Sequence, residues 1–332
     1  MKSKVALLAI HPRVGQLVLD PAAMGILEES TDLQRPTEQL WTSGWKPNPD
    51  VQILITGWGT PPIDDLALAG MPRLEAIFHT AGSIRELIST DVWARDIKVV
   101  SAADANNEYV ADFVLAQILL ALKGTYRAQE SMRAHGRLPG FSAGPGSYGQ
   151  TIGLVSFGSI ARKLRERLRI LNADVLVWDP YVSDEDFARS EVRRAESLEV
   201  LFSESRLVSV HAPLIPGVTE NLVSKQLFSS MPEGATFINT SRGAIVDEPA
   251  LIEVLANRPD LFAILDVTWP EPPANDSPLY RLPNVMLTGH TAGSVGSECL
   301  ALGRLAADEV NRFCTATPLL HAVAGEDVVL RA

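Results

Sequence analysis

Three short segments carry side chains that together could reduce a carbonyl group. Each follows a predicted buried strand, with Arg242 in NTSRG, Glu271 in DVTWPEP and His290 in GHTAG. A guanidinium can hold a carboxylate through two parallel hydrogen bonds, and an imidazole can donate a proton near neutral pH. A glutamate beside the ring can orient it and stabilise its charged form. These residue types fit reversible hydride transfer to a 2-keto acid from a nicotinamide.

Taken singly, these residues leave other interpretations open. An arginine at a strand end can be a surface salt-bridge partner, and a strand-end histidine can be structural. Their shared position is the stronger argument, because an open parallel sheet binds its ligands beyond the carboxyl ends of its strands. A cofactor site is expected at the same edge of such a sheet.

The segment 151–181, TIGLVSFGSIARKLRERLRILNADVLVWDPY, has the layout of a dinucleotide site. An apolar strand leads into a tight Ser-Phe-Gly-Ser turn, an amphipathic helix and a second short strand. A pyrophosphate binds backbone N–H groups at a helix N-terminus, so the turn must let the backbone come close. Gly158 takes the central glycine position, and Ser156 and Ala161 take the outer ones, so the motif reads S-x-G-x-x-A. A structural strand-helix-strand unit without a nucleotide is the alternative for this segment alone.

Asp179 follows the second strand, about 20 residues beyond the turn. A carboxylate there can accept hydrogen bonds from the adenosine ribose hydroxyls, and it repels a 2′-phosphate. The sequence therefore predicts NAD as the cofactor, in preference to NADP.

Composition restricts the partners. The chain has 332 residues, of which 46% are hydrophobic and 21% charged, so it is long enough for two domains. Its formal charge of −11 and pI near 5.1 argue against nucleic acid or an anionic membrane surface as the main partner. Cys299 and Cys314 lie too far apart for a C-x-x-C motif, so we expect buried thiols in a reducing compartment and no metal site. The start, MKSKVALLAIHP, is interpreted as the first buried strand of a cytoplasmic protein.

The whole chain shows an alternation of short apolar strands with helical stretches, which predicts α/β structure with parallel sheets. A first series spans residues 5–79, and a second begins at residue 151. Between them, a single long helix is expected from Asn107 towards His135, followed by a loop at 136–149. A final helix at about 297–313 could pack on the first domain. The expected strands are 5–10, 51–56, 74–79, 207–210, 235–239, 263–266 and 285–288.

Four motifs in order give the chain a plain resemblance to the D-isomer-specific 2-hydroxyacid dehydrogenases, the family of glyoxylate/hydroxypyruvate reductases, D-lactate dehydrogenases and phosphoglycerate dehydrogenases. The family's N-T-x-R-G-x-x-V-D-E run matches NTSRGAIVDE at 239–248, and its D-V-x-x-x-E-P matches DVTWPEP at 266–272. Its L-P-N-V-x-L-T-x-H-x-A-G matches LPNVMLTGHTAG at 282–293, and its H-x-P-L matches HAPL at 211–214. The likeness covers nearly the whole chain.

The resemblance implies two Rossmann-like domains with parallel sheets and an active-site cleft between them. Residues 1–106 plus 297–332 would form a flavodoxin-like substrate domain, and residues 107–296 an NAD-binding Rossmann domain with a linking helix. It further implies an NAD(H)-dependent oxidoreductase that interconverts a small 2-keto acid and a D-2-hydroxy acid, acting as a homodimer through the cofactor domain.

The resemblance also assigns roles to residues. Arg242, Glu271 and His290 would be the catalytic residues, with Asp266 at the nicotinamide carboxamide. His79 and His11, which match no motif, are expected to be structural. The substrate would meet Ala81, Gly82, Ser83, Arg242 and His290. The cofactor would meet Ser156, Phe157, Gly158, Ser159, Ile160, Asp179, His211, Ala212, Pro213, Thr219, Thr240, Ser241, Arg242, Asp266, His290, Ala292 and Gly293.

The sequence departs from the family pattern at two places, and three alternative functions remain open. Ser156 replaces the first motif glycine, and the loop HTAGSIR at 79–85 lacks the Gly-x-Asp that many members carry. Formate dehydrogenases share the fold but have glutamine in the role of Glu271, while a methyltransferase would need neither Arg242 nor His290. An NAD-sensing corepressor-like binding protein is the alternative that steady turnover of a 2-keto acid would exclude. Side chains around Trp58, 81–84 and Trp269 are expected to select the substrate.

Overall fold

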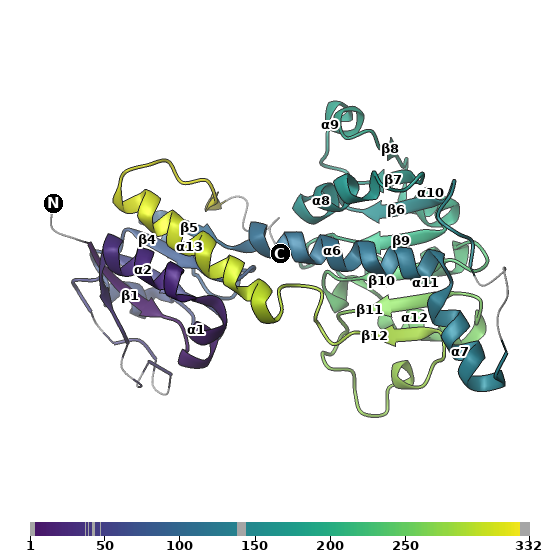
Figure 1. The fold of residues 1–332 in the computed structure, drawn as a ribbon, viewed down its shortest axis with the longest axis horizontal. Helices are drawn as coiled ribbons and strands as arrows, with labels where there is room; N and C mark the ends of the chain where they lie inside the picture. Colours follow the sequence, from purple (N-terminus) through teal and green to yellow (C-terminus); the bar gives the residue numbers. More distant parts are fainter. Residues whose placement is uncertain are drawn as a thin grey trace. The chain divides into compact units, whose positions relative to one another are not determined.

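The computed structural model describes residues 4–325 except 37, 39, 42–43, 47 and 138–143. The chain divides into two compact units (Figure 1). Unit 1 contains residues 1–106 and 294–332, and unit 2 contains residues 107–293. The sequence predicted the end of the cofactor domain at residue 296, whereas unit 2 ends at residue 293.

Unit 1 is built around a sheet with the strand order β13-β5-β4-β3-β1-β2. All neighbours are parallel except β13, which pairs antiparallel with β5. Its elements are β1 Lys4–Ala9, α1 Pro12–Val18, α2 Pro21–Ser30, β2 Thr31–Gln34, β3 Ile53–Thr56, α4 Asp65–Ala69, β4 Ala76–His79, α5 Asp91–Ala94, β5 Lys98–Ser101, the start of α6 Ala103–Leu122, η4 Gly296–Glu298, α13 Cys299–Cys314 and β13 Ala322–Val323.

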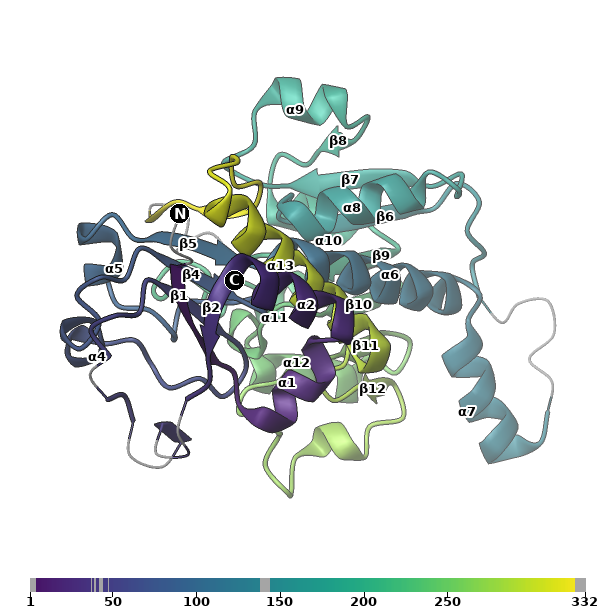
Figure 2. The same ribbon diagram turned by 60° about the vertical axis from the view of Figure 1, so that its left-hand side comes forward.

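Both faces of this sheet are buried, as expected for parallel strands covered by helices. Successive side chains of β1 point to opposite faces, so Leu8 joins a cluster with α2 and α13 while Leu7 joins one with α4. Figures 1 and 2 both show α13 lying beside α2. The glycine of α13 is required by a close approach, because a Cβ on Gly303 would lie 1.7 Å from the carbonyl oxygen of Val18.

Unit 2 holds a seven-stranded parallel sheet with the order β12-β11-β10-β9-β6-β7-β8. The strand order reverses between β6 and β9, which is the switch point where such sheets bind ligands. Besides most of α6, its elements are α7 Thr125–His135, β6 Thr151–Val155, α8 Ser159–Leu168, β7 Asp174–Trp178, α9 Asp184–Arg189, β8 Arg193–Arg194, α10 Leu198–Glu204, β9 Leu207–Val210, α11 Lys225–Ser230, β10 Thr236–Asn239, η2 Gly243–Ile245, α12 Glu248–Asn257, β11 Phe262–Leu265, η3 Pro278–Tyr280 and β12 Val285–Leu287.

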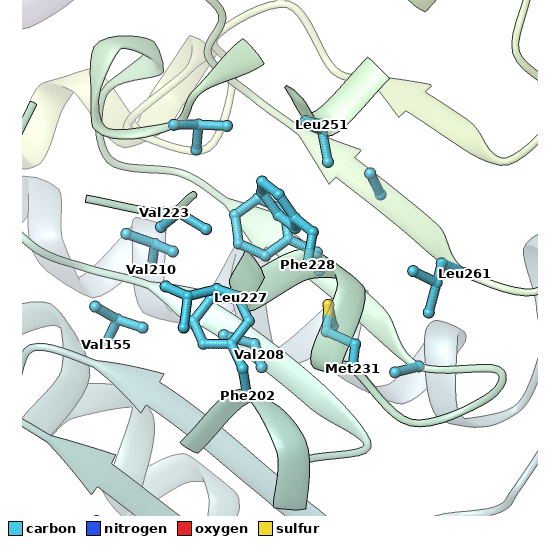
Figure 3. Packing of buried hydrophobic residues seen from close by; sticks show 14 of the residues in the cluster. Val155, Phe202, Val208, Val210, Val223, Leu227, Phe228, Met231, Leu251 and Leu261 are labelled. Atoms are coloured by element: carbon cyan, nitrogen blue, oxygen red, sulfur yellow. The ribbon is translucent and has the colours of Figure 1, made fainter. Parts of the chain in front are cut away.

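Two buried clusters hold this second sheet between helices. On one face, α6 and α8 pack against β6, with Val114 and Ile118 among the buried residues. On the other, α10, α11 and α12 cover the sheet, and Phe202 and Phe228 meet edge to face with ring centroids 6.2 Å apart (Figure 3). The prediction of α/β units with parallel sheets is therefore confirmed.

The single long helix expected from Asn107 to His135 is wrong. The helix begins earlier, at Ala103, and ends at Leu122, and a second helix, α7, starts at Thr125. Gly124 lies between them with φ +69°, a left-handed conformation that ends helices and favours glycine. The backbone N–H of Gly146 then donates to the carbonyl oxygen of Leu122, so the returning chain occupies the end of α6. Part of the expected loop at 136–149, residues 138–143, lies outside the described residues.

Within the part of the chain that the structure describes, no single helix has the length and apolar character to cross a membrane. The helices α6 and α7 pass that test of length and composition only as a pair bent by 54°.

Candidate active site

Six side chains fall in one row across the sheet of unit 2. The strand pairing aligns the last residues of β7, β6, β9, β10, β11 and β12. The next residue of each strand therefore stands at the same carboxyl edge, and backbone hydrogen bonds extend the ladder by one step at several of them. In sheet order these residues are Asp179, Ser156, His211, Thr240, Asp266 and Thr288.

The turn after β6 is tied to the residue that follows β7. Ser156 has φ +72°, the conformation for which the usual motif glycine is suited. Its hydroxyl donates to Asp179 Oδ2 over 3.1 Å, and the backbone N–H of Phe157 donates to the same oxygen over 2.8 Å. Asp179 Oδ1 accepts from the N–H of Tyr181 over 2.8 Å, and the residue is 8% exposed. The serine thus compensates for its backbone conformation with a hydrogen bond that glycine lacks.

The turn leads directly into the N-terminus of α8. Gly158 is the N-cap and has no side chain to cap the helix, and a Cβ built on it meets nothing within 4 Å. Open space at a helix N-terminus is what a phosphate group requires. Phe157 contributes only its backbone here, because its ring is buried and stacks on Phe187. Ile160 is half-buried beside the core.

Buried polar atoms without a partner mark the middle of the row. Both ring nitrogens of His211 and the hydroxyl oxygen of Thr240 are buried and lack a hydrogen bond from any described residue. Burial lowers the pKa of His211 to about 4, so the ring is neutral at pH 7. Unpaired buried polar atoms are costly, and a polar ligand such as a dinucleotide would supply partners at this edge. Orphaned polar atoms and open space at Gly158 both fit NAD.

The other cofactor-binding candidates after β9 are packed or hydrogen-bonded within their own turn. Ala212 is buried, and Pro213 is half-buried. The hydroxyl of Thr219 donates to the carbonyl oxygen of Pro213 and accepts from the N–H of Ile215, both over 2.6 Å. Thr219 therefore closes the turn after β9.

The loop after β10 is organised by Asn239. Its Oδ1 accepts from the N–H and the hydroxyl of Ser241 over 3.1 and 2.9 Å, and its Nδ2 donates to the carbonyl oxygen of Arg242 over 3.1 Å. Arg242 Nη1 donates to the carbonyl oxygen of Ser241 over 2.7 Å. A Cβ on Gly243 would lie 2.0 Å from the carbonyl oxygen of Thr268, so only glycine fits where this loop meets the loop after β11.

Asp266 holds the loop that carries His290. Its Oδ1 accepts from the hydroxyl of Thr288 over 2.6 Å and from the N–H of Thr291 over 2.8 Å, and its Oδ2 accepts from the N–H of Ala292 over 3.1 Å. Its backbone oxygen accepts from the N–H of His290 over 2.7 Å. The loop is therefore fixed on both sides of the histidine. Gly293 follows it and is half-buried.

His290 and Glu271 form a direct pair. His290 Nδ1 lies 2.5 Å from Glu271 Oε1, and the two side chains are 53% and 40% exposed. His290 has φ +59°, and the preceding Gly289 has φ +70°. This backbone conformation and the bonds to Asp266 turn the ring towards Glu271, an arrangement that fixes the imidazole for proton transfer through its other nitrogen.

The loop expected to meet the substrate lies in unit 1. Ser101 places its hydroxyl within hydrogen-bond distance of the carbonyl oxygens of Ala81 and Gly82, and Ser83 is exposed. His79, at the end of β4, is buried with Nδ1 2.9 Å from the hydroxyl of Thr56. Burial lowers its pKa to about 4, as suits a structural residue.

His11, the other histidine expected to be structural, is the N-cap of α1, and its Nδ1 accepts from the N–H of Arg13 over 3.3 Å. No group of three His, Cys, Asp or Glu side chains among the described residues is placed to hold a metal ion.

One contact beside the His290–Glu271 pair was not predicted from the sequence. Glu248 Oε2 accepts from the backbone N–H of Trp269 over 2.9 Å, in the turn that leads to Glu271. Burial raises the pKa of Glu248, and the Trp269 N–H opposes that shift. The signal was present in the motif NTSRGAIVDE, whose last residue is Glu248, but no role was attached to it.

Comparison with known proteins identifies the family. A family model described as D-isomer specific 2-hydroxyacid dehydrogenase, NAD binding domain, matches residues 115–292, just over half of the chain. The chain belongs to this family. The matched region contains the strand-end row and the His290–Glu271 pair, and the predicted NAD cofactor and dehydrogenase class are confirmed.

Individual relatives agree with the family. An (S)-sulfolactate dehydrogenase from Chromohalobacter salexigens is 34% identical over 75% of this chain and 81% of its own length. A D-3-phosphoglycerate dehydrogenase from Mycobacterium tuberculosis is 30% identical over 74% of this chain. The chain matches only 46% of that protein's length.

Solved structures share the fold over almost the full chain. A phosphoglycerate oxidoreductase from Rhizobium etli has a TM-score of 0.79 at 26% identity, covering 96% of this chain and 98% of its own. Apo D-mandelate dehydrogenase from Rhodotorula graminis has a TM-score of 0.80 at 21% identity, covering 97% of each chain, and this likeness shows the fold alone. Together the comparisons favour a 2-hydroxyacid dehydrogenase over the corepressor-like and formate dehydrogenase-like alternatives.

Proposed function

We propose that His290 is the general acid and base with which this dehydrogenase interconverts a 2-keto acid and a D-2-hydroxy acid. The 2.5 Å contact between His290 Nδ1 and Glu271 Oε1 carries the proposal. Because Glu271 occupies Nδ1, Nε2 is the atom that gives its proton to the carbonyl oxygen in reduction and takes it back in oxidation. The carboxylate of Glu271 stabilises the imidazolium that reduction requires. Bound NADH supplies the hydride to the carbonyl carbon.

The substrate carboxylate is assigned to Arg242 of unit 2, while a substrate contact of Ala81, Gly82 and Ser83 in unit 1 stays a prediction. Arg242 lies in the loop after β10, at the carboxyl edge of the sheet, and its planar guanidinium can bind a carboxylate with two parallel hydrogen bonds.

The cofactor would be held along the strand-end row. The turn of Ser156 to Ile160 would take the pyrophosphate at the start of α8, and Asp179 would take the adenosine ribose. His211 to Pro213, Thr219 and Thr240 to Arg242 would line the middle, with Asp266, His290, Ala292 and Gly293 near the nicotinamide. The unpaired polar atoms of His211 and Thr240 support this path.

Steady-state reduction of a panel of 2-keto acids with NADH tests the proposal. The panel contains glyoxylate, hydroxypyruvate, pyruvate, phenylpyruvate and branched 2-keto acids. Because two relatives are named for sulfolactate and phosphoglycerate, the panel also contains 2-keto acids with a second anionic group on the carbon next to the keto group. We expect turnover of at least one of these acids, and NADH binding without turnover of any would favour a binding protein instead.

Cofactor choice gives a second prediction. Asp179→Asn removes the charge that would repel a 2′-phosphate but keeps an oxygen that can accept from the Phe157 N–H. We expect wild type to prefer NADH and the variant to narrow the gap in kcat/KM between NADH and NADPH, by tenfold for each ~1.4 kcal/mol of repulsion removed. Equal kcat/KM for both cofactors in wild type would contradict the assigned role of Asp179.

We also propose a cytoplasmic homodimer formed through unit 2. Closed two-fold dimers are the commonest oligomers, and Leu120, Met132 and Tyr148 expose apolar side chains on and after α6 and α7. Light scattering at micromolar concentration should give twice the 36.0 kDa mass of one chain. A monomeric mass would remove this proposal and leave the assignment of the catalytic residues unaffected.

A further inference from the structure

The loops that carry Arg242 and Glu271 are joined at two points. The first is steric, because Gly243 meets the backbone of Thr268 so closely that a Cβ would lie 2.0 Å from its carbonyl oxygen. The second is polar, because the carboxylate of Glu248 accepts the N–H of Trp269 over 2.9 Å. Both contacts lie within unit 2.

Glu248 is itself held in a fixed place. It is the first residue of α12, directly after the N-cap Asp247, whose Oδ1 accepts from the N–H of Ala250 over 3.1 Å. Burial raises the pKa of Glu248, which means that its charged form is kept at a cost in solvation. The hydrogen bond from Trp269 offsets part of that cost, so the carboxylate and the turn depend on each other.

The turn that Glu248 contacts is held mainly through its backbone. The side chain of Trp269 is 67% exposed, so the residue is held by its backbone N–H and gains little from packing. Across Trp269, the hydroxyl of Thr268 donates to the carbonyl oxygen of Pro270 over 2.9 Å. Glu271 comes next, with its Oε1 2.5 Å from His290 Nδ1. Only Pro270 separates Trp269 from Glu271, so a displacement of the Trp269 backbone would move Glu271 as well.

We propose that Glu248 is a positioning residue for the reaction, because its carboxylate holds the Trp269 N–H and thereby keeps Glu271 in contact with His290. The proposal rests on the proposed function of the His290–Glu271 pair. A shift of about 1 Å would lengthen their contact beyond the range of a hydrogen bond, and misplacements of that size cost up to about a hundredfold in rate.

Three substitutions separate the parts of this claim. Glu248→Ala removes the acceptor, and Glu248→Asp keeps the charge but withdraws the carboxylate from Trp269 by one methylene. Glu248→Gln loses the charge but keeps an oxygen that can accept the N–H. We expect the Ala and Asp variants to lose about ten- to a hundredfold in kcat with unchanged NADH affinity. The Gln variant should retain most of the activity.

A matched control lies on the same helix. Glu253 is an exposed residue of α12 whose carboxylate pairs with Lys225 over 2.5 Å. Glu253→Ala should leave kcat and the pH profile of reduction as in wild type. If Glu253→Ala lowered kcat as much as Glu248→Ala, the effect would belong to helix α12 in general and the proposal would be overturned.

A double-mutant cycle with Glu271→Gln tests whether Glu248 influences the rate through Glu271. If Glu248 acts through Glu271, then Glu248→Asp should cost little further activity in the Glu271→Gln background. Both single variants should lower kcat while leaving the affinity for NADH unchanged. Losses that multiply, or a Glu248→Asp variant with the kcat of wild type, would overturn the inference. A Glu271→Gln variant without any effect would instead reject the proposed function.

Discussion

His290→Asn should bind NADH almost as wild type does and lose about 10²- to 10⁴-fold in kcat, the usual contribution of a general acid. Asparagine suits this test because it tolerates the left-handed conformation that His290 adopts at φ +59°, so the loop held by Asp266 should keep its shape. Stopped-flow binding of NADH and steady-state reduction of a 2-keto acid measure the two quantities separately. Full turnover by this variant would remove His290 from the reaction.

The pH dependence follows from the direction of proton transfer. Reduction consumes a proton and oxidation releases one, so reduction should fall and oxidation should rise as pH increases. Glu271→Gln removes the carboxylate that pairs with His290, so the kcat of reduction should fall. A Glu271→Gln variant with the kcat of wild type would contradict the pairing of these two residues in catalysis.

Arg242→Lys should lower kcat/KM for the 2-keto acid although the positive charge is kept. A lysine cannot present the planar fork that binds both carboxylate oxygens, and a lost hydrogen bond to a charged group costs about 1.5–3 kcal/mol. The expected loss is roughly ten- to a hundredfold, mainly as a higher KM for the acid. Steady-state kinetics at saturating NADH measures it.

A control substitution on the surface separates this effect from a general effect of replacing arginine by lysine. Arg189 on α9 pairs with Asp186 at an exposed site, and Arg189→Lys should leave kcat/KM unchanged. If Arg242→Lys retained the kcat/KM of wild type, Arg242 would have to be assigned a structural role instead.

The strand-end row could be predicted because parallel strands follow simple rules. A buried strand, a tight turn and a helix place Ser156 at the switch point, and the next strand brings Asp179 to the same edge. The hydrogen bonds from the Ser156 hydroxyl and the Phe157 N–H to Asp179 explain why serine is accepted in place of the motif glycine. That explanation needed coordinates, because it depends on where a carboxylate points.

Contacts between loops could not be predicted from the sequence either, because they also depend on where side chains point in space. Asp266 was assigned to the nicotinamide, and its three hydrogen bonds to the His290 loop depend on the register of β11 and β12. The bond between Glu248 and Trp269 joins two segments whose approach is decided by packing at Gly243. The break between α6 and α7 is different, because Gly124 is visible in the sequence, but the apolar pattern before it was extended into the polar segment that follows.

The central claim is that this chain reduces a 2-keto acid with His290 as its proton donor. The most direct test is the rate of NADH oxidation by wild type and by His290→Asn with the best substrate of the keto-acid panel, measured across pH. The account predicts steady turnover by wild type that declines as pH rises, and a variant that binds NADH but is slower by about 10²-fold or more. Equal rates for the two proteins would contradict it.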